Sequence, residues 1–127
     1  MMNEEDEILV LIERMSGLAN LRDVDGLMAL HHSKETVFLF GQMATHEGNR
    51  RYCAQGYAAL RGEFSYEFIP LNIAVGSDIA FVFGEERTKG ATDAGSFASV
   101  INATYCLKKT GGRWLITHQH LSMRNQG

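Results

Sequence analysis

Hydrophobic residues recur at helical spacing through the first sixty positions. Between residues 4 and 22 they fall three and four positions apart, which predicts a helix with one apolar stripe and an acidic first turn. Asp23 is a predicted N-cap for a short second helix. The β-branched and aromatic residues 36–40 predict a strand, residues 41–48 a loop, and residues 49–60 a third helix.

After residue 62 the hydrophobic period changes from helical to strand-like. Residues 64–75 predict one long strand whose apolar positions change from even to odd midway. Pro70 lies at this switch, which predicts a β-bulge there. Gly76 and Ser77 predict a two-residue hairpin loop, and residues 78–88 the returning strand.

Two further strands are predicted to complete a meander. They span residues 96–109 and 113–123, after a loop at 89–95 and with a glycine turn at 110–112 between them. Helices followed by a meander predict an α+β fold, with helices on one face of a strongly bent antiparallel sheet. Both faces of the hairpin at 71–83 are largely apolar, so we expect both to be covered.

Composition restricts the class of protein. The chain has 127 residues, 45% hydrophobic and 21% charged, which fits one globular domain and excludes a disordered or fibrous chain. A net charge of −3 argues against a nucleic-acid partner. No apolar run approaches the roughly 20 residues of a membrane helix, and the acidic residues 1–7 lack the cationic start of a secretory signal. Two cysteines without zinc or redox spacing favour a reducing compartment, so we expect a cytoplasmic protein without a cofactor.

Three segments carry a family resemblance. The ending GGRWLITHQHLS at 111–122, the phrase DVDGLMAL at 23–30 and the hairpin at 71–83 resemble the SnoaL-like group of the nuclear transport factor 2-like superfamily. The likeness covers about residues 5–123 and implies a single domain over residues 1–127. It implies a cone-shaped fold, with three N-terminal helices packed in a strongly curved, mostly antiparallel sheet around an apolar pocket. It also implies a homodimer formed through the outer sheet face.

The resemblance implies a small lipophilic ligand but no assignable activity. Family members include ketosteroid isomerases, polyketide cyclases, dehydratases and epoxide hydrolases, whereas others only bind or assemble. Phe38 and Leu39 stand where the isomerases carry Glu and Asp, and neither side chain can accept a proton. No acidic residue follows Asp93, so the second acid of the isomerases and the Asp of the epoxide hydrolases are absent from the last strands.

His118 and His120 are the strongest polar signal near the C-terminus. Their spacing places both imidazoles on one face of the last strand, with Trp114 and Ile116. They are candidate acid–base residues for an isomerase, cyclase or dehydratase, or alternatively histidines of the core or an interface. A third metal ligand is not close in sequence, so no metal site is predicted.

The opposite face of the last strand is favoured as the pocket wall, which places the histidines at the subunit interface. If the preceding hairpin loop has three residues, the odd positions 115–121 join an apolar set at 101–107 with few polar tips. The predicted ligand-binding residues are Tyr57, Tyr105, Thr117, Gln119 and Phe40.

Other polar residues are interpreted as structural. Glu85 is expected to pair with Arg87 or with Tyr66 across the strands. His31 and His32 are expected to lie at a solvated helix end.

A third function remains open, because the W-x-I-x-H-x-H ending also resembles the association domain of calcium/calmodulin-dependent kinases. In that case the apolar sheet faces serve oligomerisation only.

Overall fold

The computed structural model describes residues 2–124 and contains three helices, each with a side-chain N-cap. Asn3, Asp23 and Thr45 accept hydrogen bonds from backbone N–H groups three residues later, as helix N-caps do. The predicted cap at Asp23 is therefore confirmed. The helices are α1 (Glu4–Asn20), α2 (Val24–Met28) and α3 (His46–Ala58).

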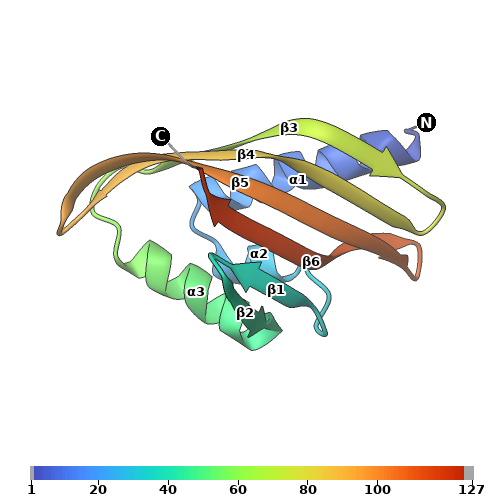
Figure 1. Cartoon of the computed structure of the whole chain (residues 1–127), viewed down its shortest axis with the longest axis horizontal. Helices are drawn as coiled ribbons and strands as arrows, with labels where there is room; N and C mark the ends of the chain where they lie inside the picture. Colours follow the sequence, from blue (N-terminus) through green and yellow to red (C-terminus); the bar gives the residue numbers. More distant parts are fainter. Residues whose placement is uncertain (1, 125–127) are drawn as a thin grey trace.

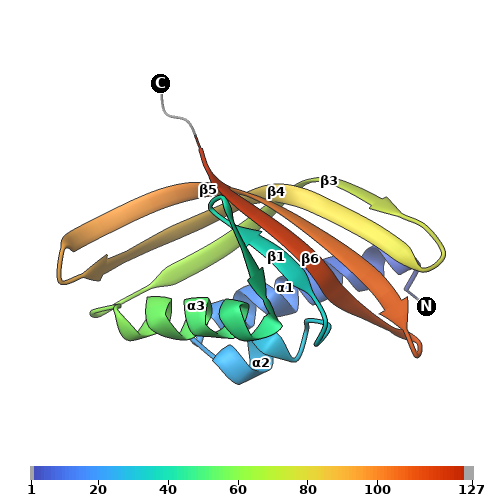
Figure 2. The ribbon, with the colours of Figure 1, turned by 60° about the horizontal axis from the view of Figure 1, so that its bottom comes forward.

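Six strands form one curved sheet over the helices (Figures 1 and 2). Its order is β2-β1-β6-β5-β4-β3, and only β1 and β6 are parallel among the paired strands. The predicted α+β class and the curved, mostly antiparallel sheet are confirmed. The strands are β1 (Thr36–Leu39), β2 (Gln42–Thr45), β3 (Ser65–Val75), β4 (Ile79–Thr92), β5 (Gly95–Thr110) and β6 (Arg113–Met123).

Two of the predicted loops are largely regular structure. The segment 41–48 contains β2 and the start of α3, because Phe40 and Gly41 adopt φ angles of 55° and 91° and turn the chain back on β1. Phenylalanine seldom adopts a positive φ, so the sequence gives no sign of this turn. The segment 89–95 continues β4 and begins β5, which leaves only residues 93–94 outside the strands.

The predicted bulge on β3 is confirmed. The pairing of β3 with β4 shifts between Pro70 and Asn72, which leaves Leu71 unpaired. The hairpin loop lies one residue later than predicted, since the Gly76 N–H donates to the Ile79 carbonyl at 2.8 Å. This shift preserves the faces of both strands, because it changes the pairing register by two positions.

A second bulge on β6 decides which side chains face inward. Leu107 pairs with Ile116, but Cys106 pairs with His118, so Thr117 has no partner on β5. The inward set therefore changes parity along β6. Trp114 and Ile116 face the core in the first half and Gln119 and Leu121 in the second. The odd face that was favoured as the pocket wall is therefore correct only over the second half. The loop before β6 has two residues rather than three, so it is the bulge that turns the odd positions inward.

The hydrophobic core lies between the concave face of the sheet and the helices, mainly α1. Its fully buried side chains include Ile8, Val82, Leu107 and Ile116. The helices cover the concave face only, so the expected cover of the convex face would have to come from a second chain. Phe81 and Phe83 on this face are 40% and 39% exposed. The described residues contain no helix long and apolar enough to cross a membrane.

Candidate ligand pocket

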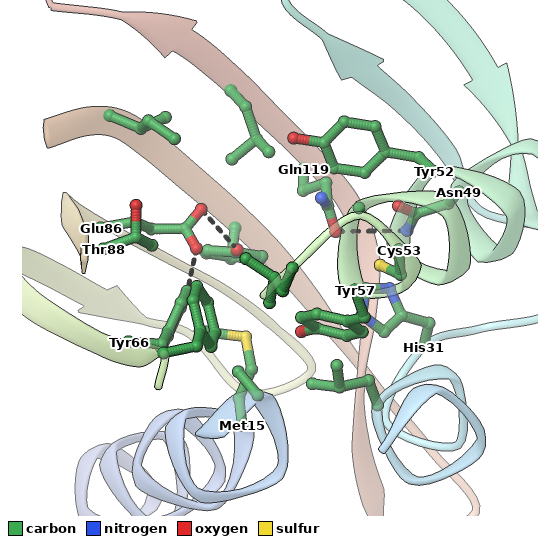
Figure 3. Close-up of a pocket in the computed structure, with 18 of the residues that line it drawn as sticks. Met15, His31, Asn49, Tyr52, Cys53, Tyr57, Tyr66, Glu86, Thr88 and Gln119 are labelled. Carbon is green, nitrogen blue, oxygen red and sulfur yellow. Dashed lines mark hydrogen bonds between the residues drawn. The ribbon is translucent and has the colours of Figure 1, made fainter. Parts of the chain in front are cut away.

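A pocket of about 260 Å³ lies between α3, α1 and the concave face of the sheet (Figure 3). Strands β4, β5 and β6, the start of β3 at Tyr66, and the loop between α3 and β3 all contribute side chains to its wall. Most of its wall is carbon. Its apolar and aromatic lining comprises Met15, Ala19, Leu27, Tyr52, Gly56, Tyr57, Leu60, Phe64, Tyr66, Phe97, Ile101, Tyr105 and Leu121.

Three of the five residues predicted to bind a ligand line this pocket. These are Tyr57 from α3, Tyr105 from β5 and Gln119 from β6. Thr117 is not in the lining, because it is the unpaired residue of the β6 bulge. Phe40 is also outside the lining, although its ring lies 6.1 Å from that of Tyr52, which does line it.

His118 and His120 lie on the other face of β6. The ring of Phe38 packs against both, at centroid distances of 5.7 and 5.6 Å, and His118 Nδ1 is hydrogen-bonded to the carbonyl oxygen of Thr36. Neither histidine lines the pocket. The predicted acid–base role for these two residues is therefore wrong for this pocket, because the sheet itself separates them from it.

A buried carboxyl group, Glu86, is the main polar feature of the β4 wall. It is 6% exposed and accepts hydrogen bonds from the phenol groups of Tyr66 and of Tyr105, the latter at 3.1 Å (Figure 3). Burial raises the pKa of Glu86, and the two phenol donors only partly oppose this effect. Burial also raises the pKa of Tyr66 and of Tyr105 well above the ordinary value.

The neighbouring Glu85 lies on the opposite face of β4. Of the two partners left open for it, Arg87 is correct, since Glu85 faces the convex side and pairs with Arg87 and Arg124 at 3.0 and 2.7 Å. Strand parity places Glu86 on the same face as Val82, and the structure shows that this is the face buried in the core. The last strands lack an acidic residue, as the sequence shows, but β4 supplies the carboxyl group of Glu86 to the pocket.

A second buried carboxylate, Glu35, lies behind the opposite wall. His31 Nδ1 and His46 Nδ1 are each 2.8 Å from one of its oxygens, and Asn49 Nδ2 donates at 3.4 Å. Burial is the largest influence on this group and opposes ionisation. The hydrogen bonds and charge of His31, with those of His46 and Asn49, nevertheless hold the pKa of Glu35 below its ordinary value.

His31 belongs to the pocket rather than to a solvated helix end, which corrects the prediction for this residue. Its side chain is only 6% exposed and it lines the pocket. Because the ionised Glu35 only accepts hydrogen bonds, His31 Nδ1 donates to it. The other ring nitrogen, Nε2, is then the atom available for proton transfer.

Asn49 connects the Glu35 cluster to the sheet. It is 1% exposed and its Nδ2 donates to Gln119 Oε1 at 3.4 Å, whereas its Oδ1 is buried without a hydrogen-bond partner.

The pocket that the described residues form contains neither an activated thiol nor a metal site. Burial raises the pKa of the Cys53 thiol to about 11, so this cysteine is not an activated nucleophile. Within residues 2–124 no group of three His, Cys, Asp or Glu side chains is arranged to hold a metal ion.

Comparisons with known proteins agree on one fold. The sequence model of the SnoaL-like domain matches residues 8–126. A structure of an NTF2-like protein of unknown function from Pseudomonas putida KT2440 has a TM-score of 0.81 at 21% identity, covering 96% of this chain and 89% of its own. An NTF2-like protein with a cystatin-like fold from Novosphingobium aromaticivorans has a TM-score of 0.82 at 18% identity, with coverages of 98% and 84%.

A ketosteroid isomerase-like protein from Erwinia carotovora atroseptica SCRI1043 is also similar in structure. Its TM-score is 0.80 at 16% identity, covering 98% of this chain and 99% of its own. No curated protein matches the sequence. At these identities the structural likeness establishes the fold alone.

Proposed function

Because the chain belongs to the SnoaL-like domain family, we propose that it binds one small, largely apolar organic molecule in the pocket beneath the sheet. The observation that carries this proposal is the pocket itself. It has a mainly carbon wall, with a small number of polar groups from Glu86, Asn49, Gln119 and His31. This is the usual composition of a small-molecule site.

The size of the pocket limits the ligand. Its volume of about 260 Å³ lies just below the range of roughly 300–1,000 Å³ that is usual for ligand pockets. A compound with one ring and a short polar substituent is the expected scale. The expected setting remains the cytoplasm.

Two glycines offer a matched test of this function. Gly56 lines the pocket, Gly17 does not, and both are helical positions where an added Cβ meets no atom within 4 Å. We expect a panel of one-ring alcohols, ketones and amines to contain binders detected by calorimetry. Gly56→Phe should abolish their binding and Gly17→Phe should leave it intact. A panel without binders, or equal binding by both variants, would refute the proposal.

One observation favours a second candidate, an acid–base enzyme of the isomerase, cyclase or dehydratase type. Two buried carboxyl groups have pKa values that shift in opposite directions: upward for Glu86, which lines the pocket, and downward for Glu35, which lies behind the wall at His31. Such divergence is typical of paired acid and base groups. In this candidate His31 transfers the proton through Nε2, and Glu35 is the positioning residue that fixes its tautomer.

Exchange of α-protons in D2O tests this second candidate without a known substrate. Any small ketone that binds in the panel above serves as the probe, with proton NMR as the measurement. The enzyme candidate predicts faster exchange with the wild type, loss with His31→Gln, and no loss with His118→Gln on the convex face. Exchange at the buffer rate for every bound ketone would exclude it and leave the binding function standing.

A further inference from the structure

Glu86 has no counter-cation among residues 2–124. Its carboxyl group meets only the phenols of Tyr66 and Tyr105, and no Lys or Arg side chain is in the pocket lining that the described residues form. The imidazole of His31 lies at the other end of the pocket (Figure 3), where it is hydrogen-bonded to Glu35. Two phenol donors suit an ionised carboxylate, so the missing component is a positive charge.

A second polar group in the pocket, the side-chain oxygen of Asn49, lacks a hydrogen-bond donor. Asn49 Oδ1 is buried without a partner, while the amide nitrogen of the same side chain is used by Glu35 and Gln119. A buried acceptor without a donor costs free energy, which a bound molecule recovers when it donates a hydrogen bond there. Both polar ends of the pocket therefore favour a ligand that donates.

The wall between these ends is rich in aromatic rings. Tyr52 and Tyr57 from α3, Phe64 before β3 and Phe97 from β5 line the pocket together with the two tyrosines on Glu86. The faces of aromatic rings attract cations, and more strongly when water is excluded. An aromatic wall with one buried carboxylate is the arrangement that recognises organic ammonium groups.

We propose that the ligand of this pocket is a small organic amine, bound as its ammonium ion with the charged nitrogen hydrogen-bonded to the Glu86 carboxylate. This inference rests on the proposed binding function and names its ligand class. Binding converts any protonated Glu86 to the carboxylate, and the displaced proton passes to solvent. The ammonium group keeps its own protons and donates them to Glu86 and its surroundings.

The groups next to Glu86 leave its own carboxyl group as the source of this proton. Tyr66 from β3 and Tyr105 from β5 touch it, and Tyr52, Cys53 and Tyr57 face it from α3. Burial raises the pKa of each of these five groups, so all five stay protonated at neutral pH. The residues that line the pocket from α1, Met15 and Ala19, do not titrate. Glu86 is thus the group near the amine that changes its protonation.

Calorimetry with three probes of one shape tests the inference: phenethylamine, 2-phenylethanol and phenylacetate. We expect the wild type to bind phenethylamine at least about ten-fold more tightly than 2-phenylethanol, and phenylacetate most weakly. Glu86→Gln should remove the preference for the amine and retain alcohol binding. The matched control is Glu85→Gln, which removes the same charge from the convex side and should retain the preference.

A second measurement on the wild type does not depend on a variant. Calorimetry in buffers of different ionisation enthalpy, at mildly acidic to neutral pH, should detect proton release with phenethylamine and none with 2-phenylethanol. Equal affinity for amine and alcohol, a preference that survives Glu86→Gln, or amine binding without proton release throughout this range would overturn the inference while the binding function stands. Failure of every probe to bind overturns the inference as well, and the wider panel then decides the binding function separately.

Discussion

At the scale of single residues, two buried glutamates, one in the pocket and one behind its wall, are under opposite influences. Both Glu35 and Glu86 are buried, which disfavours their charge. Two histidines and an asparagine surround Glu35 and lower its pKa, whereas Glu86 has only phenol partners and its pKa rises. The two groups therefore have opposite effects on the pH dependence of stability.

The Glu35 cluster predicts a loss of stability in acid. Because the pKa of Glu35 is lower in the folded chain, its contribution is present above the unfolded pKa and disappears as the pH falls through the folded pKa. Glu35→Gln should reduce the free energy of unfolding by about 1–3 kcal/mol at neutral pH. Urea unfolding of both proteins at several pH values should show this difference shrinking in acid, and a difference that grows as the pH falls would contradict the account.

Glu86 predicts the reverse trend. Its folded pKa is raised, so the folded state holds the proton more tightly and stability falls as the pH rises from the unfolded pKa through the folded pKa. Glu86→Gln lacks this titration. Urea unfolding of the ligand-free proteins should show that the variant gains stability relative to the wild type as the pH rises between these two pKa values. A difference that stays constant with pH would show that Glu86 titrates normally.

Local sequence patterns predict part of the pocket lining. Tyr57 and Tyr105 could be predicted because the periodicity of their segments places them on inward faces. Gln119 faces inward because of the bulge on β6. His31 could not be predicted, since its position depends on Glu35, an acidic residue that only the tertiary structure places beside two histidines. Such a cluster has no signature in local spacing.

At the scale of elements, two bulges determine which side chains face the pocket. The bulge on β3 was visible in the sequence because Pro70 coincides with a change of apolar parity. The bulge on β6 at Thr117 carries no Pro or Gly, and both of its flanking halves are apolar enough to face inward. Register of this kind is set by pairing with β5 and not by β6 alone.

Close packing at the β3 bulge makes a prediction about Gly84. A Cβ at this position would lie 2.0 Å from the Ile69 carbonyl oxygen, so Gly84→Ala requires the paired backbones to move apart. We expect a loss of about 1–3 kcal/mol in unfolding free energy. Gly17→Ala, in open space within α1, should instead gain about 0.5–1 kcal/mol from helix propensity. Urea denaturation compares them, and a neutral Gly84→Ala would contradict the contact.

At the scale of the whole molecule, the convex face of the sheet is unusually apolar for exposed surface. Phe81 and Phe83 stack with ring centroids 6.5 Å apart, and Leu71 and Ile79 beside them are 61% and 59% exposed. Exposed apolar surface of this extent usually marks an interaction site. We propose that it is covered by a second copy of the chain, in a homodimer that leaves the pocket on the opposite side of the sheet.

Replacement of one ring tests this dimer. Phe83→Arg places a charge in the centre of the apolar face and should convert a dimer into a monomer without changing ligand affinity. Size-exclusion chromatography with light scattering provides the mass. A wild-type monomer would contradict the proposal, and a large ring would favour the association-module alternative.

Fold class was predictable at this scale because helical and strand periodicities are long and well separated along the chain. The family followed from the same order of elements and from the C-terminal motif. The chemistry of the pocket was not predictable, because Glu86 in β4 and Asn49 in α3 are distant in sequence and line one pocket only in the folded chain.

Proton NMR locates a bound molecule most directly. With 2-phenylethanol or phenethylamine added to isotope-labelled protein, we predict intermolecular nuclear Overhauser effects to the methyl groups of Met15, Ile101 and Leu121 inside the pocket. The exposed methyl groups of Leu71 and Ile79 should show none. Contacts confined to the convex face, or no contacts at saturating concentrations of either compound, would contradict the account.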